Sequence, residues 1–117
     1  MSSVPIDIEQ LSHISGDDSE FESEILLEFC ELTADLIGDL QRAASEGDIQ
    51  TTYSLAHTIK GSARTIGAIH VADVAEVIEA GARSGEASQF QQGLAQLIAA
   101  FRDVEAFVHE RCTSDAA

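Results

Sequence analysis

The sequence predicts an all-α fold, an antiparallel up-down four-helix bundle with a short N-terminal helix packed across it. Three observations lead to this prediction: apolar residues recur every three or four positions, Pro5 is the single proline among 117 residues, and aromatic residues make up only 5%. This period is typical of amphipathic helices, whereas half-buried strands alternate every second residue. Four such helices with short links favour an up-down bundle. We expect a single domain, 1–117, with a core from about 7 to 108.

The N-terminal part of the chain predicts one short and one long helix. The short helix covers residues 7–15 and ends where Gly16 interrupts the apolar pattern. The long helix begins after Asp18 or Ser19, where Ser19 and Glu22 have the spacing of a capping box, and it stops before Gly47. Its expected apolar stripe consists of Phe21, Ile25, Phe29, Leu32, Leu36 and Leu40, with Leu26 and Ile37 at its shoulder.

The next helix is expected to begin near Asp48, a candidate N-cap, and to end at Gly67. Leu55, Ile59 and Ile66 form its apolar face at spacings of four and seven residues. A third stripe contains Val71, Val74 and Ile78, with Val77 as an optional member, and ends near Gly85. These two segments therefore predict two further amphipathic helices.

The last helix is expected to open at Ser88, which has capping-box spacing to Gln91. Its apolar stripe is formed by Phe90, Leu94, Leu97, Ile98, Phe101 and Val108. The tail 112–117 follows this stripe, and we expect it to fray.

Charge and composition restrict the classes of partner. The chain has 21 acidic and six basic residues and a formal net charge of −15, which opposes binding to nucleic acid and to anionic membranes. No segment has the pattern of a secretory signal or of a membrane span, so we expect a cytoplasmic protein and a monomer. Cys30 and Cys112 match no metal-binding or CxxC spacing, so two unpaired thiols are expected.

The most informative residues lie on the helix that follows Asp48. At about 100° per residue, His57, Gly61 and Arg64 point nearly opposite the apolar face, and Lys60, the only lysine, lies to one side. His57 should therefore be exposed beside two cations. A glycine inside a helix costs roughly 1 kcal/mol relative to alanine. Close approach by another molecule is one reason for such a residue at position 61.

This combination of side chains suits the chemistry of phosphoryl groups. A neutral imidazole has a free ring nitrogen that can attack phosphorus, and a neighbouring cation offsets charge on the transferring group. The three other histidines, His13, His70 and His109, have no such surroundings. We interpret those three as solvated or core side chains.

Residues 56–63, Ala-His-Thr-Ile-Lys-Gly-Ser-Ala, followed by Gly67-Ala68, closely resemble the signature of histidine-containing phosphotransfer (HPt) domains of multistep phosphorelays. The Gly47-Asp48 turn and the stretch from Ile78 to Gly85 are similar to that family as well, so the resemblance covers most of residues 7–108. Ile59 stands where the family usually has leucine.

The resemblance implies a four-helix bundle whose histidine accepts a phosphoryl group from a receiver-domain phosphoaspartate, or from a kinase, and relays it to a response-regulator aspartate. By position, His57 would be the phosphoacceptor, Lys60 a phosphate-stabilising cation and Gly61 the clearance for the receiver. Ser62 and Arg64 match flanking positions that dock or orient. A polar group on the following helix near the ring is also implied, with Glu79 and Arg83 both open. The partners would be receiver domains and a sensor or hybrid histidine kinase, and the receiver would supply Mg²⁺.

Other functions have less support in the sequence. It contains neither GxxxxGK[ST] nor GxGxxG, so we expect a phosphoryl carrier without autonomous kinase activity and without a cofactor. A di-metal bundle needs Glu-x-x-His pairs, whereas Glu9–His13 and Glu105–His109 are four residues apart, so no metal site is expected. The remaining alternative is an HPt-like helical module that binds proteins without phosphotransfer. The imidazole argues against it, because a docking surface alone does not need a nucleophile.

Overall fold

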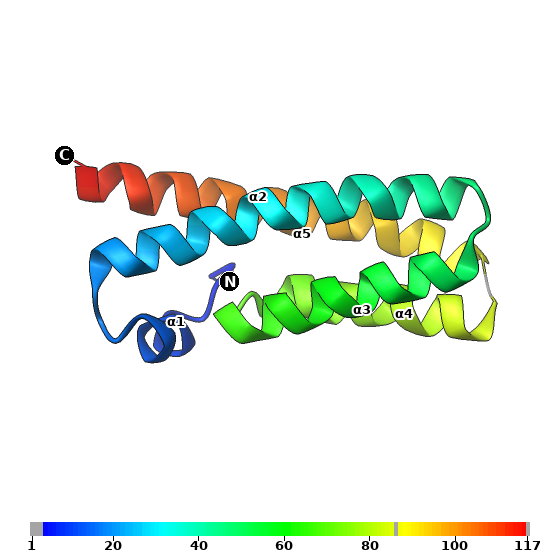
Figure 1. Cartoon of the computed structure of the whole chain (residues 1–117), viewed down its shortest axis with the longest axis horizontal. Helices are drawn as coiled ribbons and strands as arrows, with labels where there is room; N and C mark the ends of the chain where they lie inside the picture. The colour runs from blue at the N-terminus through cyan, green and yellow to red at the C-terminus, as the bar shows by residue number, and fades with distance from the viewer. Residues whose placement is uncertain (1–3, 86, 117) are drawn as a thin grey trace.

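The computed structural model describes residues 4–85 and 87–116, with side chains described for 4–85 and 90–112. Within these ranges the chain forms five helices and no strand (Figure 1). They are α1 (Ile8–Ser15), α2 (Ser19–Ser45), α3 (Ile49–Ile66), α4 (Ile69–Ser84) and α5 (Ala87–Ala116). The all-α class predicted from the apolar period is confirmed.

The four long helices lie side by side along the longest dimension of the molecule, which is 46 Å. Each of them packs against two others: α2 contacts α3 and α5, and α4 contacts α3 and α5. Figure 1 shows that consecutive long helices run in opposite directions. The short helix α1 lies at one end of the molecule, against α2 and α3. Four apolar helix faces therefore enclose one core.

Aspartate side chains begin the first three helices. The carboxylate of Asp7 accepts hydrogen bonds from the backbone at the start of α1, that of Asp18 does so for α2, and that of Asp48 for α3. Such bonds satisfy N–H groups that have no partner inside the helix. The predicted N-cap at Asp48 is confirmed. The predicted capping box of Ser19 and Glu22 is wrong, because Asp18 is the cap and Ser19 is already helical.

The buried face of α2 differs from the predicted stripe. Phe21 and Leu32 are 46% and 53% exposed, although both were expected in the stripe. Leu26 and Ile37, expected at its shoulder, are buried instead, together with Thr33. The helix is thus rotated about its axis relative to the prediction.

The other long helices bury the residues that their periodicity predicts. On α3, Ile59 and Ile66 are buried and Leu55 packs partly buried against the core. The predicted stripe of α4 is buried, whereas its optional member Val77 is 46% exposed. On α5 the buried predicted residues are Phe90, Leu97, Phe101 and Val108, with Leu94 and Ile98 partly buried.

Gly67 ends α3 and joins it to the N-terminal segment. Its φ of +86° is in the left-handed region, which glycine adopts at little cost. Its carbonyl accepts a hydrogen bond of 2.9 Å from the backbone nitrogen of Asp7, and a Cβ at Gly67 would lie 3.1 Å from the Asp7 carbonyl oxygen. The predicted helix end at Gly67 is confirmed, and the turn also anchors the residues before α1.

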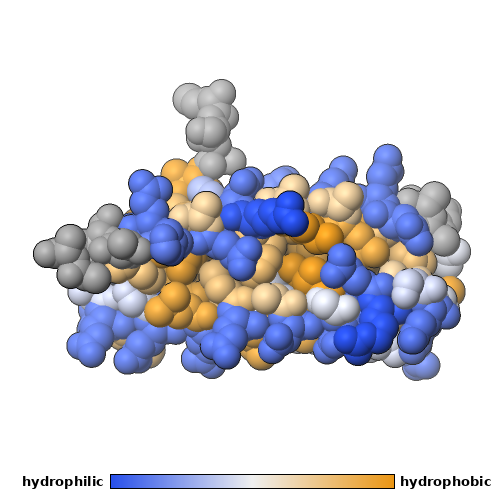
Figure 2. Space-filling model, turned by 90° about the horizontal axis from the view of Figure 1, so that it is seen from above, coloured by the Kyte–Doolittle hydropathy of each residue, from blue (hydrophilic) through white to orange (hydrophobic). Residues whose placement is uncertain are grey.

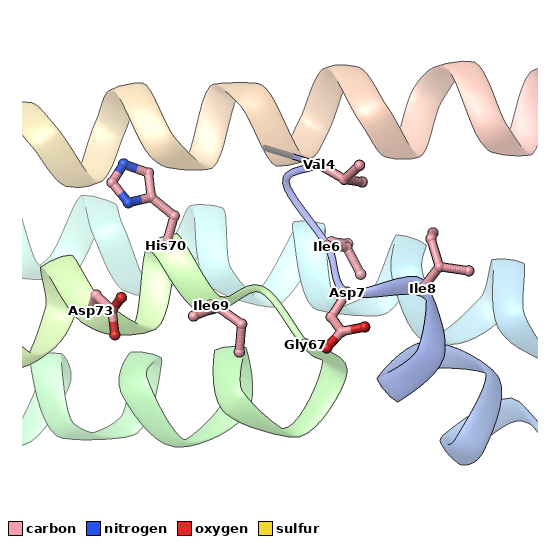
Figure 3. A pocket seen from close by; sticks show the side chains of 8 residues that line it. All are labelled: Val4, Ile6, Asp7, Ile8, Gly67, Ile69, His70 and Asp73. Carbon is pink, nitrogen blue, oxygen red and sulfur yellow. The ribbon is translucent and has the colours of Figure 1, made fainter. Parts of the chain in front are cut away.

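An open hollow of about 500 Å³ lies where this segment meets the start of α4. Figure 3 shows its lining side chains: Val4, Ile6, Asp7 and Ile8 come from the N-terminal segment and α1, and Ile69, His70 and Asp73 from α4. Ile6 is fully buried and forms part of the core, whereas Val4 and Ile69 are 59% and 49% exposed.

Two expectations concern α5. Its backbone is helical as far as Ala116, so residues 112–116 of the expected tail lie on the last turns of this helix, and residue 117 lies outside the described residues. Fraying of the tail stays a prediction. The capping box of Ser88 and Gln91 lies outside what the structure describes, because the side chain of Ser88 is not among the described ones.

Candidate functional site

His57 lies near the middle of α3, on the face that points away from the core. Its side chain is 62% exposed, whereas its neighbours Ala56 and Ile59 are fully buried. The helical period produces this difference, because Ala56 and Ile59 are turned by about 100° and 200° from His57. The predicted exposure of His57 is confirmed.

A carboxylate from α4 contacts the imidazole. The Oε2 atom of Glu79 lies 2.8 Å from Nδ1 of His57, and Oε1 of the same side chain accepts a hydrogen bond from Nζ of Lys60. Glu79 is only 3% exposed and Lys60 15%, so the ion pair is largely shielded from water. One buried carboxylate thus holds both residues that the sequence places side by side on α3.

The surroundings of Glu79 keep it ionised. Burial acts to raise the pKa of this carboxyl, but the hydrogen bonds and positive charge from Lys60 and His57 outweigh burial and lower the pKa below its ordinary value of 4.5. An ionised carboxylate can only accept hydrogen bonds, so the proton in the contact with His57 must be on Nδ1. The lone pair of a neutral His57 then belongs to Nε2, the ring nitrogen that Glu79 does not contact.

An aromatic ring lies beside the imidazole. Tyr53, four residues before His57 on α3, has its ring centroid 6.2 Å from that of His57, with an angle of 8° between the two planes. The guanidinium of Arg83 on α4 donates a hydrogen bond of 3.1 Å to the Tyr53 hydroxyl and lies 3.8 Å from Glu79 Oε2. Tyr53 was not among the predicted site residues, although its spacing to His57 places both on one helix face.

The remaining predicted site residues surround His57 at different positions. Apart from its chain neighbours and the backbone of its own helix, Gly61 has no heavy atom within 4 Å of the place where a Cβ would stand, so the space above it is open. Arg64 lies 3.4 Å from Glu76 Oε1 on α4, and its ion pair is separate from that of Lys60 with Glu79. The hydroxyl of Ser62 bonds weakly to the Ile59 carbonyl at 3.4 Å. The structure therefore joins Lys60 to His57 through the carboxylate of Glu79, whereas Gly61, Ser62 and Arg64 are neighbours on the helix.

A shallow groove of about 280 Å³ runs along the other side of α3, between α3 and α2. Ser62, Thr65 and Ile66 line it from α3, and Ile25, Glu28, Phe29 and Leu32 line it from α2. Figure 2 shows apolar surface interrupted by polar side chains on the side where α2 and α5 lie. Leu32 was predicted to be part of the core, but it is exposed and gives this groove an apolar rim.

Other candidate groups stand apart from the site. Within the described residues, no group of three or more His, Cys, Asp or Glu side chains is arranged to hold a metal ion. In the same part of the chain, no helix has the length and apolar content needed to cross a membrane. Cys30 and Cys112 are half-buried free thiols, as predicted. Burial raises the pKa of Cys30 to about 11, which leaves it a protonated, unreactive thiol near neutral pH.

Comparison with known proteins places this geometry in a family. A search against curated proteins gave no match. Among solved structures, histidine-containing phosphotransfer protein B (HptB) from Pseudomonas aeruginosa PAO1 is similar, with a TM-score of 0.88, 24% identity, and coverage of 96% of this chain and 98% of that one. A putative histidine-containing phosphotransfer protein from rice has a TM-score of 0.82, 19% identity, and coverage of 92% and 79%. At these identities the likeness establishes a shared fold.

The sequence itself matches a family model. The Hpt domain model matches residues 24–107, which is most of the chain. The matched range includes α3 and α4, with His57, Lys60 and Glu79. The chain therefore belongs to the Hpt domain family.

Proposed function

We propose that His57 is the phosphoacceptor, which takes a phosphoryl group from a receiver-domain phosphoaspartate, or from a kinase, and relays it to a response-regulator aspartate. As a member of the Hpt domain family, the chain has a histidine phosphotransfer role in phosphorelays. The observation that supports His57 most is its exposed imidazole with Nδ1 fixed on the buried carboxylate of Glu79. None of the other histidines in the described residues has such a contact.

The geometry favours attack by Nε2. In the transfer, Nε2 forms a bond to phosphorus while the bond between phosphorus and the aspartyl oxygen breaks, so the receiver carboxylate leaves with its electron pair. The proton stays on Nδ1, and the phosphorylated ring then carries a positive charge. The ionised Glu79 at 2.8 Å offsets this charge without moving, which is the electrostatic stabilisation that such a step needs.

Lys60 would act on the phosphoryl group itself. Its ammonium lies on the same helix face as His57 and is held by Glu79, so its position is set before a partner binds. A fixed cation beside the reacting atoms stabilises charge on the transferring group at little reorganisation cost. We assign Lys60 this role, with Gly61 as clearance for the receiver and with Ser62 and Arg64 as docking residues.

The partner would complete the site. We propose that a receiver domain approaches over Gly61 and contacts the groove between α2 and α3, and that it brings its own Mg²⁺. With Mg²⁺ supplied by the receiver and the histidine by this chain, the protein would be a phosphoryl carrier that has no kinase activity of its own and acts as a monomer. The alternating helices would then be an antiparallel up-down bundle, with α1 packed across its end, that serves as a rigid support for α3. The cytoplasmic location expected from the sequence stays a prediction.

Phosphotransfer from a labelled donor tests this proposal. The protein is incubated with a phosphorylated receiver or a cognate kinase, and the product is examined for phosphate that is acid-labile and base-stable, as a phosphohistidine is. His57→Gln should gain no label while its circular dichroism and thermal unfolding stay near those of the wild type, because the side chain is exposed. Equal labelling of the variant and the wild type would contradict the assignment of His57.

The alternative is a protein-binding module that does not carry phosphate. Its support is the apolar groove between α2 and α3, which would bind a partner without an imidazole. The same assay separates the two functions when receiver binding is measured in parallel. Tight binding of receivers with no transfer from any of their phosphorylated forms would favour the module.

A further inference from the structure

We propose that Tyr53 is a positioning residue for the His57 imidazole and that Arg83 acts on that imidazole through Tyr53. The effect on the transfer rate rests on the proposed function of His57. The effect on the orientation of the ring does not, and it can be measured on the unphosphorylated protein.

One contact alone does not fix the orientation of the imidazole. The contact between Nδ1 and Glu79 fixes one atom of the ring, but the ring can still turn about that atom and swing Nε2 sideways. The Tyr53 ring, parallel to the imidazole within 8°, adds a flat surface that restricts this turn. The separation of 6.2 Å between the centroids is within the range of offset-stacked aromatic pairs. The two contacts together define where Nε2 points.

The Tyr53 ring is itself supported by a residue of α4. Its ring is only partly buried, so packing alone does not fix it. Arg83 fixes it from α4, with a hydrogen bond of 3.1 Å to the hydroxyl and a guanidinium carbon 5.4 Å from the ring centroid. Arg83 is itself four residues after Glu79 and lies 3.8 Å from Glu79 Oε2. Helix α4 thus supplies both the carboxylate that bonds to His57 and the cation that supports the stacked ring.

A different role for Arg83 must be separated from this one. Its side chain is 67% exposed, so it can also be pictured as a second cation that contacts the phosphoryl group directly. The two roles predict different effects of an Arg83 substitution when the Tyr53 hydroxyl is removed. A residue that works through the Tyr53 hydroxyl has no effect once that hydroxyl is absent, whereas a direct contact keeps its effect.

The ring orientation is tested by NMR relaxation of the His57 ring carbons Cδ2 and Cε1 in the unphosphorylated protein. Tyr53→Ala removes the stack, Tyr53→Leu keeps apolar bulk without a flat ring, and Tyr53→Phe keeps the ring without the hydroxyl. We expect the order parameters of the His57 ring to fall in the Ala and Leu variants and to stay closer to the wild type in the Phe variant. Unchanged ring order in Tyr53→Ala would overturn the proposal.

Single-turnover transfer rates from a saturating phosphorylated receiver give the functional readout. For Tyr53→Ala we expect a rate about tenfold lower, since misplacement of a reacting group slows a positioned reaction, and a receiver concentration for half-maximal rate that is unchanged. Thermal unfolding of each variant serves as a control for folding. An unchanged rate, or a loss of receiver affinity at an unchanged maximal rate, would contradict a positioning role.

A double-mutant cycle tests the path from Arg83 to His57. Arg83→Ala should slow transfer in the wild-type background and should have no further effect in the Tyr53→Phe background. An equal slowing in both backgrounds would show that Arg83 acts directly, and the second half of the proposal would be wrong. If no protein, wild type included, is phosphorylated while ring order still depends on Tyr53, the proposed function fails and the positioning role stands.

Discussion

At the residue scale, Glu79 connects the two side chains that make this site unusual, and it does so from a different helix. The sequence was sufficient to predict that His57 is exposed and that Lys60 lies beside it, because both follow from the helical period of α3. It left Glu79 and Arg83 as equal candidates. Only the packing of α4 on α3 decides between them: it brings the Glu79 carboxylate onto Nδ1 and leaves Arg83 on Tyr53.

The lowered pKa of Glu79 predicts how stability depends on pH. Above pH 4.5, its ordinary pKa, the folded protein holds an ionised carboxylate paired with Lys60. Glu79→Gln removes this charge and should lower the free energy of unfolding near neutral pH by about 2 kcal/mol, less than for a fully buried pair because Lys60 can turn towards water. Urea unfolding of both proteins at several pH values measures the difference.

The sign of the pH effect is the critical outcome of that experiment. Because the folded pKa is depressed, the stabilisation is present above pH 4.5 and is lost as the pH falls through the folded value. The wild type and Glu79→Gln should therefore approach equal stability in acid. A difference that grows on acidification would contradict the assigned ionisation state. Glu76→Gln is a suitable control, since its partner Arg64 is 51% exposed.

Gly61 and Gly38 offer a matched pair of substitutions. Both lie inside helices, and beyond the local helix backbone and chain neighbours no heavy atom lies within 4 Å of where a Cβ would stand. Glutamine at either position should therefore stabilise the fold by about 0.5 kcal/mol through helix propensity. Only Gly61 is one turn from His57. We expect Gly61→Gln to weaken receiver binding or transfer at least tenfold, and Gly38→Gln to leave both unchanged. Equal transfer by the two variants would show that Gly61 does not provide clearance for the receiver.

At the element scale, α2 shows where periodicity fails as a guide. Apolar residues cover a wide arc of this helix, so several stripes fit its sequence equally well. Packing against α3 and α5 selects the stripe that contains Leu26, Thr33 and Ile37, and it turns Phe21 and Leu32 outwards. On α3 and α4 the residues of the predicted stripes are buried or partly buried, so there the prediction agrees with the structure. Helix ends were predicted well where a glycine with positive φ or an aspartate cap marks them.

The turn between α3 and α4 provides a test of how α1 is attached. Gly67→Ala must accept a φ of +86° and place a Cβ 3.1 Å from Asp7 O and from Gln10 Cβ, so we expect a loss of about 2–3 kcal/mol in unfolding free energy. Gly85→Ala has a similar φ of +75° but open space around its Cβ, and should cost only about 1 kcal/mol. Denaturant midpoints measure both. Equal losses would mean that the contact with the N-terminal segment contributes nothing.

At the scale of the whole molecule, three of the six basic residues lie on the two helices that form the site. Of the six basic residues in the chain, Lys60 and Arg64 form ion pairs from α3 to α4, and Arg83 forms one with Glu79 within α4. In an acidic molecule, three cations on two neighbouring helices would attract an anionic phosphoryl group more strongly than the surrounding acidic surface does.

The same charge distribution predicts a response to salt. With 21 acidic and six basic residues, repulsion between carboxylates outweighs the surface ion pairs, and salt screens both. Raising NaCl from low to physiological concentration should therefore increase Tm by about 3–6 °C. Choline chloride at equal ionic strength should give the same increase if screening is the cause, whereas an increase with NaCl alone would indicate a bound ion. A Tm that falls with added salt would mean that the ion pairs around Glu79 contribute more to stability than the relief of repulsion across the acidic surface.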